Sequence, residues 1–390
     1  MKVGLILPGF SASETDWCIP ALLALVRELA ARHDVRVFPL RYPHTTRPYR
    51  VHGARVVPLG GGDTRGLARL ALLRRALAAV ALAHRRERFD VLHAFWADEP
   101  GFVAVAAGWR LGVPAIVSLA GGELVHLPDI GYGGAASRLN RWLVGIALRG
   151  AAHTTAGSRA VIRLAAPHVP RGTVSLVPLG VDTARFAPAT PRRQGEETRL
   201  LHVGSLVPVK DQAGLLRACA LLAGEYPALR LAIAGDGPLR PRLEALVAEL
   251  GLAGRVTFQG AVAHDHLPAL YQAADLFSLS SRYEAQGLVA LEAAACGLPI
   301  VGTAVGCLPD LGPAARCAPP GNPQALASAL RAVLSDPAER ERLRRAGLAA
   351  VAARYTLAHT VAALEELYRC AGGRPTTSPD GRVARQGGSG

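Results

Sequence analysis

The sequence is poor in lysine, in aromatic residues and in long hydrophobic runs. Phe, Trp and Tyr make up 5% of its 390 residues, and its lysines are Lys2 and Lys210. No run of about 18 uncharged apolar residues occurs, which argues against a transmembrane helix. The N-terminal segment MKVGLILPGF has too short an apolar core for a signal peptide, so we interpret it as a first β-strand. We therefore expect a cytoplasmic protein.

Motifs that would indicate a metal or a dinucleotide cofactor are also missing. The six cysteines are scattered without a C-x-x-C pair, which is typical of reduced thiols and argues against a zinc site or a disulfide framework. No G-x-G-x-x-G fingerprint opens either half of the chain, which argues against a nicotinamide or flavin dinucleotide. We therefore expect neither a metal ion nor a bound cofactor.

Acidic residues are outnumbered, and most of the positive excess lies in the first half. The formal net charge is +14, and residues 1–183 hold 22 Lys and Arg residues against 12 Asp and Glu. Such a charge favours an anionic partner, although a coding bias toward arginine would produce the same excess. Nucleic acid is not expected, because basic and aromatic residues do not alternate. A peripheral contact with an anionic membrane surface stays open.

A long helix is predicted at residues 65–88, RGLARLALLRRALAAVALAHRRER. Its arginines cluster at both ends and in the middle, as they do in helices that lie in a membrane interface. The favoured interpretation is a helix packed on the core with a solvated basic face, and an interfacial membrane helix is the alternative.

Short apolar segments alternate with longer helical patterns, and the series starts again after residue 197. This alternation predicts an α/β protein with two Rossmann-like doubly wound domains that face each other across a cleft. The predicted strands include 3–9, 35–40, 90–96, 114–121, 198–206 and 229–238. The predicted parts are a first domain at 1–182, a linker at 183–197, a second domain at 198–355, a C-terminal helix at 356–371 and a disordered tail at 372–390.

The segment SRYEAQGLVALEAAACGLP (281–299) places two glutamates among small and apolar residues. On one continuous helix, Glu284 and Glu292 would lie about 80° apart and would not share a face. Gly287 removes the difficulty if a loop that carries Glu284 enters a helix near Leu288. The small residues around Glu292 indicate that this helix packs closely against the protein.

The predicted helix has a defined end and an open start. Gly297 and Pro299 are typical of a helix C-terminus. Free N–H groups at Gly287, Leu288 and Val289 would point, with the helix dipole, at whatever occupies the cleft.

A second loop, VGSLVPVKD (203–211), follows a predicted strand. Its lysine, Lys210, lies near the start of a helix, where an ammonium and backbone N–H groups suit a phosphate or diphosphate. In a chain that otherwise uses arginine, this internal lysine is informative. The glycine turn AGDGP (234–238) after another predicted strand indicates only a turn.

These segments together resemble the family 4 (group 1) retaining glycosyltransferases, which have the GT-B fold. The E-x₇-E motif of that family is matched by EAQGLVALEAAACGLPIVGTAVG (284–306). The supporting matches cover nearly the whole chain in the family's order, and they are DVLHAFW (90–96), VPAIVSLAGGE (113–123), VPLGVDTARFAP (177–188), VGSLVPVKD (203–211) and AGDGPLRPRLE (234–244).

The resemblance implies that a nucleotide-diphosphate sugar binds in the cleft and gives a hexose to a saccharide, lipid-linked or small-molecule acceptor with retention of configuration. Lys210 and the helix start would neutralise the departing diphosphate without a metal. Glu292 would bind the ribose hydroxyls, and Glu284 would face the donor sugar. The residues implied to bind the donor are Gly204, Ser205, Lys210, Glu284, Gly287, Leu288, Val289 and Glu292, of which Lys210 and Glu284 are expected to be catalytic.

Two positions depart from the family pattern. Ser205 stands where the family usually has an arginine beside the lysine, and Ala120 stands where it often has a histidine followed by glycine. Arg282 is a candidate to supply the missing cation, and Gly9 and His93 are candidates for further cleft contacts. The departures leave two alternatives open, a catalytically weak nucleotide-sugar-binding protein and another GT-B enzyme such as a sugar-nucleotide epimerase.

Overall fold

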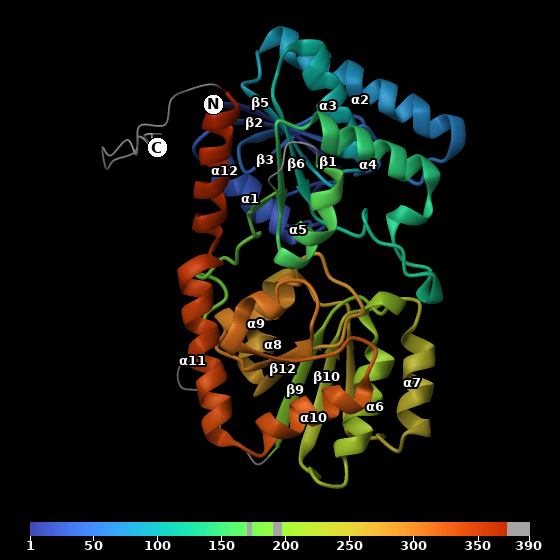
Figure 1. The fold of residues 1–390 in the computed structure, drawn as a ribbon, viewed down its shortest axis with the longest axis vertical. Coiled ribbons are helices and arrows are strands. Elements are labelled where there is room, and N and C mark those ends of the chain that lie inside the picture. The colour runs from blue at the N-terminus through green and yellow to red at the C-terminus, as the bar shows by residue number, and fades with distance from the viewer. Residues whose placement is uncertain (170–173, 190–196, 373–390) are drawn as a thin grey trace, which may run out of the picture.

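The computed structural model describes residues 1–169, 174–189 and 197–372. Within these residues the chain forms two α/β domains, each built on its own sheet, one above the other in Figure 1. The predicted fold class of two Rossmann-like doubly wound domains is confirmed. The predicted tail after residue 372, and residues 190–196 of the predicted linker, lie outside the described residues.

The first domain is built on a sheet of eight described strands in the order β3-β4-β2-β1-β5-β6-β7-β8. All neighbours in this sheet are parallel except β3 and β4. Their bounds are β1 (Lys2–Gly9), β2 (Asp34–Tyr42), β3 (Tyr49–Val51), β4 (Ala54–Val56), β5 (Val91–Phe95), β6 (Ala115–Leu119), β7 (His153–Ala156) and β8 (Val174–Leu176). The central strands are continuous apolar runs because helices cover both faces of a parallel sheet.

The helices of the first domain connect these strands. Their bounds are α1 (Pro20–Ala30), α2 (Gly66–Arg86), α3 (Glu99–Leu111), α4 (Arg138–Gly150) and α5 (Arg159–Ala165), with short 3₁₀ turns η1 (Pro128–Ile130), η2 (Gly134–Ala136) and η3 (Ala166–His168). The helix predicted at 65–88 is α2, and it packs on the core as expected. Its exposed side carries leucines as well as arginines, so the expected solvated basic face is only partly right.

The second domain is built on a parallel sheet of six described strands in the order β11-β10-β9-β12-β13-β14. The strands are β9 (Thr198–Val203), β10 (Leu229–Ala234), β11 (Val256–Gly260), β12 (Leu276–Leu279), β13 (Ile300–Thr303) and β14 (Ala315–Ala318). The helices are α6 (Gln212–Leu222), α7 (Arg240–Glu249), α8 (Leu267–Ala273), α9 (Leu288–Ala295), α10 (Pro323–Leu334) and α11 (Pro337–Arg354), with the 3₁₀ turns η4 (Pro208–Lys210), η5 (His264–His266) and η6 (Pro309–Ala314).

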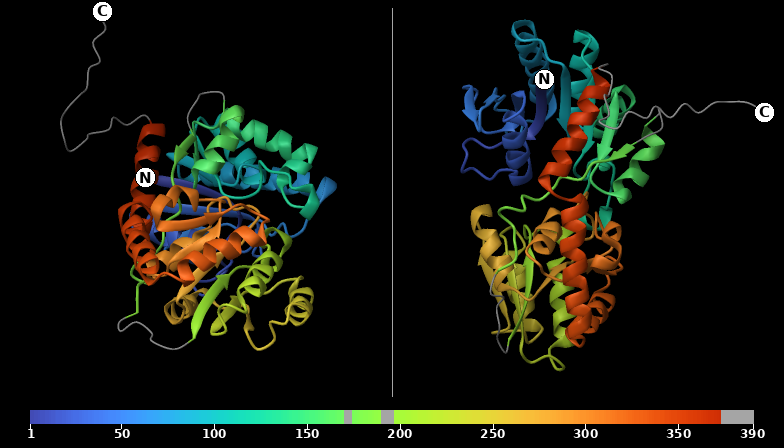
Figure 2. Two further views of the ribbon diagram at one scale, coloured as in Figure 1. Left: turned by 60° about the horizontal axis from the view of Figure 1, so that its bottom comes forward. Right: turned by 90° about the vertical axis from the view of Figure 1, so that its left-hand side faces the viewer.

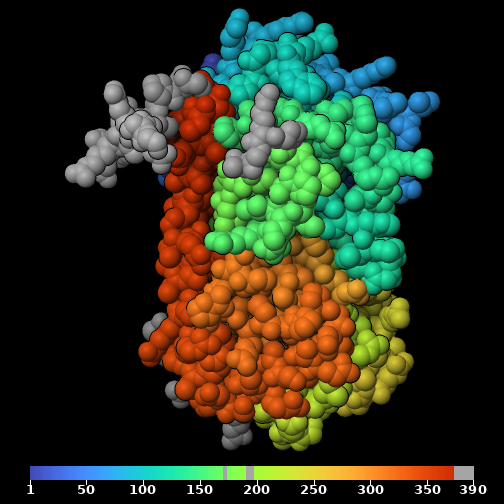
Figure 3. Space-filling view, viewed as in Figure 1, coloured from blue at the N-terminus to red at the C-terminus, as the bar shows by residue number. Residues whose placement is uncertain are grey.

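The C-terminal helix α12 (Leu357–Ala371) returns to the first domain. It continues from α11 along one side of the molecule and crosses from the lower domain to the upper one (Figures 2 and 3). Its Val361, Leu364 and Tyr368 are buried in the same core as β1 and α1. Where α12 begins, Thr356 forms a bridge with Val181 of the segment that leaves the first domain. The segment that leaves the first domain and the segment that returns to it are therefore hydrogen-bonded to each other.

The direction of winding reverses at one point in each sheet. In the first sheet the reversal lies between β1 and β5, and in the second sheet it lies between β9 and β12. Loops at the carboxyl ends of such strands leave room for a ligand. The two reversal points place these loops where the domains meet. None of the helices in the described residues combines the length and the apolar character needed to cross a bilayer.

Candidate active site

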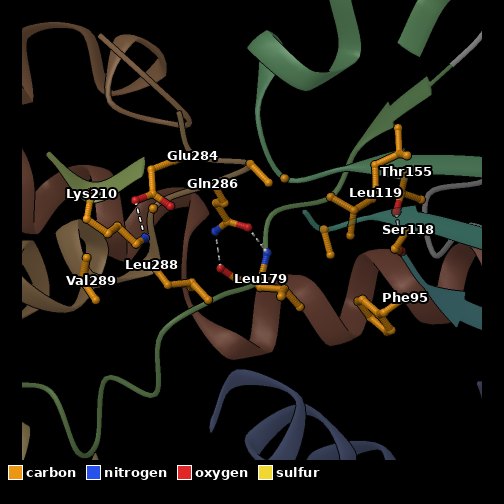
Figure 4. Close-up of a pocket in the computed structure, with 15 residues that line it drawn as sticks. Phe95, Ser118, Leu119, Thr155, Leu179, Lys210, Glu284, Gln286, Leu288 and Val289 are labelled. Carbon is orange, nitrogen blue, oxygen red and sulfur yellow. Dashed lines mark hydrogen bonds and ion pairs between the residues drawn. The ribbon is translucent and has the colours of Figure 1, made fainter. Parts of the chain in front are cut away.

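A cavity of about 260 Å³ lies where the two domains meet. The first domain lines it with side chains at the carboxyl ends of β5, β6 and β7, including Phe95, Ser118 and Thr155. The second domain lines it with Lys210 and the segment 284–289 (Figure 4). The stretch that carries the first glutamate of the sequence motif therefore forms one wall of an interdomain site.

The start of α9 opens into this cavity. Gly287 has a φ of 90°, a left-handed conformation that favours glycine, and it turns the chain from the loop into the helix at Leu288. No side chain caps this helix. The first N–H groups of a helix have no partner inside it, and the dipole makes this end positive. Gly287, Leu288 and Val289 line the cavity, so the wall that they form suits an anion.

Lys210 and Glu284 lie side by side in the same wall. Lys210 is placed by η4 after β9, and its Nζ donates to Glu284 Oε1 over 2.6 Å. Ser281 Oγ donates to the same carboxylate oxygen, also over 2.6 Å. Among the described residues, Glu284 Oε2 accepts no hydrogen bond, so this oxygen is available to a ligand in the cavity. The ion pair holds the ammonium beside the positive end of α9.

Glu292 lies about one turn into α9, as predicted, but its carboxylate is already occupied. Tyr271 Oη donates to Oε2 over 2.9 Å, and His264 Nε2 lies 3.1 Å from Oε1. Glu292 is 9% exposed and does not line the cavity. Each of these oxygens has one partner, so the carboxylate keeps acceptor capacity for the ribose contact that the resemblance implies.

The loop after β9 carries Gly204 and Ser205, and neither residue lines the cavity. The side chain of Ser205 is exposed and forms no hydrogen bond within the described part of the chain. The donor contact that the resemblance implies for Ser205 therefore stays a prediction. Gly9, at the end of β1, is buried against Tyr42 and also lies off the cavity, so the expected cleft contact is not seen.

The expected cleft contact of His93 is wrong. His93 is fully buried, and burial lowers its pKa to about 3. Its ring nitrogens contact Tyr368 Oη over 2.7 Å and Ser118 Oγ over 2.8 Å, and Ser118 in turn pairs with Thr155. His93 thus links α12 to Ser118 and Thr155, which line the cavity, and does not line the cavity itself.

Arg282 does not replace the arginine that is missing at Ser205. Its guanidinium donates to Asp129 in η1 over 2.8 Å, across the domain boundary. Lys210 is the single lysine or arginine among the cavity-lining residues of the described chain. The site therefore has one side-chain cation where the family pattern usually has two.

Sequence reasoning missed the residue that holds the loop in place, Gln286. Its side-chain amide donates to the carbonyl of Leu179 over 2.6 Å and accepts from the Leu179 N–H over 2.8 Å. Beside it, Ser158 Oγ donates to the carbonyl of Ala285 over 2.7 Å. All three bonds join the first domain or its exit segment to the second domain. The one signal in the sequence was an amide side chain among small and apolar neighbours.

A second interdomain contact lies near Glu292. The ring of Trp17, from the loop after β1, lies 5.0 Å from the His264 ring and tilted to it, and the guanidinium of Arg185 lies over the indole at 4.6 Å. Its indole N–H donates to Asp265 over 3.1 Å. Sequence reasoning singled out no residue in the loop at residues 9–17, although a tryptophan in a polar loop is a signal. The contact joins the first domain to the turn that carries His264, the residue beside the motif's second glutamate.

The turn at Ala120 is held by a buried acid. Glu123 accepts the N–H groups of Ala120 over 3.2 Å and Gly121 over 2.8 Å. Burial raises the pKa of Glu123 to about 7. Ala120 lines the cavity, and Tyr283 Oη reaches over from the second domain to the carbonyl of Gly121. At Ala120, where the family often has a histidine, the conformation of the turn is therefore held by hydrogen bonds to backbone groups.

Two Rossmann-like domains, with a lysine and an open helix start on the cavity between them, define a glycosyltransferase of the GT-B class. Two family models match the chain, "Glycosyl transferases group 1" over residues 185–349 and "Glycosyl transferase 4-like domain" over residues 19–180. A D-inositol 3-phosphate glycosyltransferase from Thermobispora bispora is 33% identical over 306 residues, which span 72% of this chain and 70% of that protein. The chain belongs to the family 4, group 1 glycosyltransferases.

Solved structures agree on the fold. Sucrose-phosphate synthase from Thermosynechococcus elongatus has a TM-score of 0.78 at 23% identity, with 95% of this chain and 98% of that chain covered. HepE from Anabaena, solved in complex with UDP-glucose, has a TM-score of 0.72 at 21% identity, with coverages of 95% and 100%. For two further relatives named as D-inositol 3-phosphate glycosyltransferases, the match spans about half of their own length.

Proposed function

We propose that the protein transfers a hexose from a nucleotide-diphosphate sugar to a saccharide, lipid-linked or small-molecule acceptor, with retention of anomeric configuration. The observation that carries the proposal is that Lys210 and the uncapped start of α9 line the same interdomain cavity. A fixed ammonium and oriented N–H groups stabilise the negative charge that develops on a leaving diphosphate. This charge stabilisation requires no metal ion, so we propose a metal-independent reaction.

Glu284 has two separate tasks in this reaction. Its Oε1 accepts hydrogen bonds from Lys210 and Ser281, and its Oε2 is open to a hydrogen bond from a hydroxyl of the donor sugar. We further propose that the carboxylate stabilises positive charge at the anomeric carbon. With the leaving phosphate on the same side as the acceptor, a phosphate oxygen takes the acceptor proton as the glycosidic bond forms. The new bond then keeps the configuration of the old one.

The acceptor should bind on the first domain, on the opposite wall of the cavity. This wall is largely apolar and contributes Phe95, Leu119, Val177 and Leu179, with hydroxyls from Ser118 and Thr155. Because one relative is named for an inositol 3-phosphate acceptor, phosphorylated polyols belong in the acceptor panel beside sugars and lipid-linked sugars.

The decisive experiment measures release of the nucleoside diphosphate from a panel of UDP-, GDP- and ADP-hexoses, with each acceptor, in the presence of EDTA. We expect one donor to turn over and the product to keep the donor's anomeric configuration by proton NMR. Tight binding of a donor that never turns over would favour a nucleotide-sugar-binding protein. Formation of an epimeric sugar nucleotide from donor alone would favour an epimerase, and inversion would refute the retaining mechanism.

A further inference from the structure

Helix α2 is apolar on two opposite sides. Its inner side packs in the core of the first domain through Leu72, Ala76 and Val80. Its outer side carries Leu67 and Leu82, which are 84% and 52% exposed. The same side also carries Arg74 and Arg85, and a helix that combines exposed apolar and basic side chains is typical of a membrane interface. The outer side of α2 therefore lacks an apolar partner among the described residues.

A groove of about 780 Å³ lies between this outer side of α2 and the end of α3. Its apolar wall includes Leu77, Leu82 and Trp109, and Trp109 is 65% exposed. An indole ring, apolar with one polar N–H, is favoured at the boundary between water and lipid. The groove therefore presents interfacial side chains to the outside.

Three arginines, Arg74, Arg85 and Arg110, line the same groove, and no acidic residue does. Arg74 and Arg85 lie about 20° apart around α2, so they follow one line along the helix. Within the described part of the chain, none of the three forms an ion pair or a hydrogen bond. Glu87, just after the helix, is paired with other arginines. The three guanidinium groups are therefore open to an anionic partner.

We propose that the groove between α2 and α3 docks the protein on an anionic membrane surface. Arg74, Arg85 and Arg110 contact lipid phosphates, while their apolar stems, Trp109 and Leu82 enter the boundary between headgroups and acyl chains. The position agrees with this, because α2 lies at the outer end of the first domain, away from the second (Figure 1). A bilayer there leaves both domains free to approach each other.

The charge of the groove also decides between partners. A second copy of the chain would bring the same acid-free surface against this one, and like charges would repel. Nucleic acid would satisfy the arginines but would leave the exposed leucines without an apolar partner. An anionic bilayer satisfies both kinds of side chain.

Co-sedimentation of the full chain with vesicles tests the proposal. We expect binding to phosphatidylcholine vesicles that contain phosphatidylglycerol and none to phosphatidylcholine alone, and salt should weaken it. Each arginine should raise partitioning about fivefold, so the variant R74E/R85E/R110E should lose about a hundredfold or more. The matched control R163E/R217E/R369E changes three exposed arginines elsewhere, with the same change in net charge, and should keep most of the binding.

A second variant addresses the apolar part of the contact. L82S/W109S should remove the binding that survives at high salt while leaving the melting temperature close to that of the parent protein. Equal losses in the two triple variants would overturn the proposal, because net charge alone would then explain the binding. Absence of vesicle binding at low salt would also overturn it. So would a dimer, or a DNA complex, that depends on the groove residues while vesicles do not bind.

Discussion

Replacing Lys210 by methionine should separate its catalytic contribution from its structural one. Methionine keeps most of the apolar stem of the side chain and removes the charge. The ammonium is the single side-chain cation lining the described cavity, so the leaving diphosphate would keep only the helix start as a fixed positive partner. Removal of one such fixed donor lowers turnover about 10²- to 10³-fold in other enzymes. We expect a loss at the upper end of this range for K210M.

The same change should destabilise the fold by a smaller amount. At 2.6 Å and an effective dielectric constant of about 20, the attraction between Lys210 and Glu284 is about 6 kcal/mol before the desolvation of both groups is subtracted. The side chains are 24% and 12% exposed, so desolvation offsets most of this attraction. A net coupling of about 1–3 kcal/mol is therefore expected. Ser281 still donates to the remaining carboxylate and limits the loss.

The double variant K210M/E284Q distinguishes the two effects. It removes both charges, so its free energy of unfolding should recover most of what K210M loses. Its turnover should stay at or below that of K210M, since the leaving group still lacks its cation. Urea unfolding and single-turnover kinetics measure the two quantities. If the turnover of K210M, or that of the double variant, stayed within about threefold of the parent, the assignment of Lys210 to the diphosphate would be refuted.

Three further predictions concern neighbouring residues. The variants E284Q and E292Q should each lower turnover by at least about tenfold, or roughly 1.4 kcal/mol of barrier, and unchanged steady-state rates for both would contradict their roles. Q286L should lower the free energy of unfolding by about 2 kcal/mol, because both backbone groups of Leu179 lose their partner, and a melt unchanged from the parent would contradict this. Burial raises the pKa of Glu123 to about 7, above its unfolded value of about 4.3, so the contribution of Glu123 to stability should be greatest below pH 4.3 and should be lost as the pH rises through 7. Urea titrations should show that E123Q lacks this slope.

The local geometry of the motif could be predicted because it depends on nearby residues. The glycine at 287 requires a turn, and the residues after it have no signal that would stop a helix until Gly297. The structure has α9 at Leu288–Ala295, with Gly287 and Gly297 in left-handed conformations. Strand positions followed in the same way from continuous apolar runs. These features are fixed by short-range sterics and burial.

The partners of the polar side chains could not be predicted because they come from distant parts of the chain. Glu292 faces Tyr271 and His264, and His93 faces a tyrosine on the last helix. Arg282, a candidate to supply the missing cation, donates to Asp129 across the domain boundary instead. The partner of each side chain depends on which distant segments the fold brings together, and the spacing of residues along the chain does not contain this information.

The missing arginine at Ser205 explains why Lys210 should matter more here than a lysine that shares its task. In a site with two cations, loss of one leaves the diphosphate with a second fixed charge. Here the side chain of Ser205 is exposed and forms no hydrogen bond with a described residue, and the guanidinium of Arg282 is paired with Asp129. Changing Ser205 to arginine should therefore add a cation at the cleft edge and partly restore turnover to K210M. A tenfold recovery in S205R/K210M, with no gain from S205A/K210M, would place the diphosphate between these two positions, and equal rates in both would place it elsewhere.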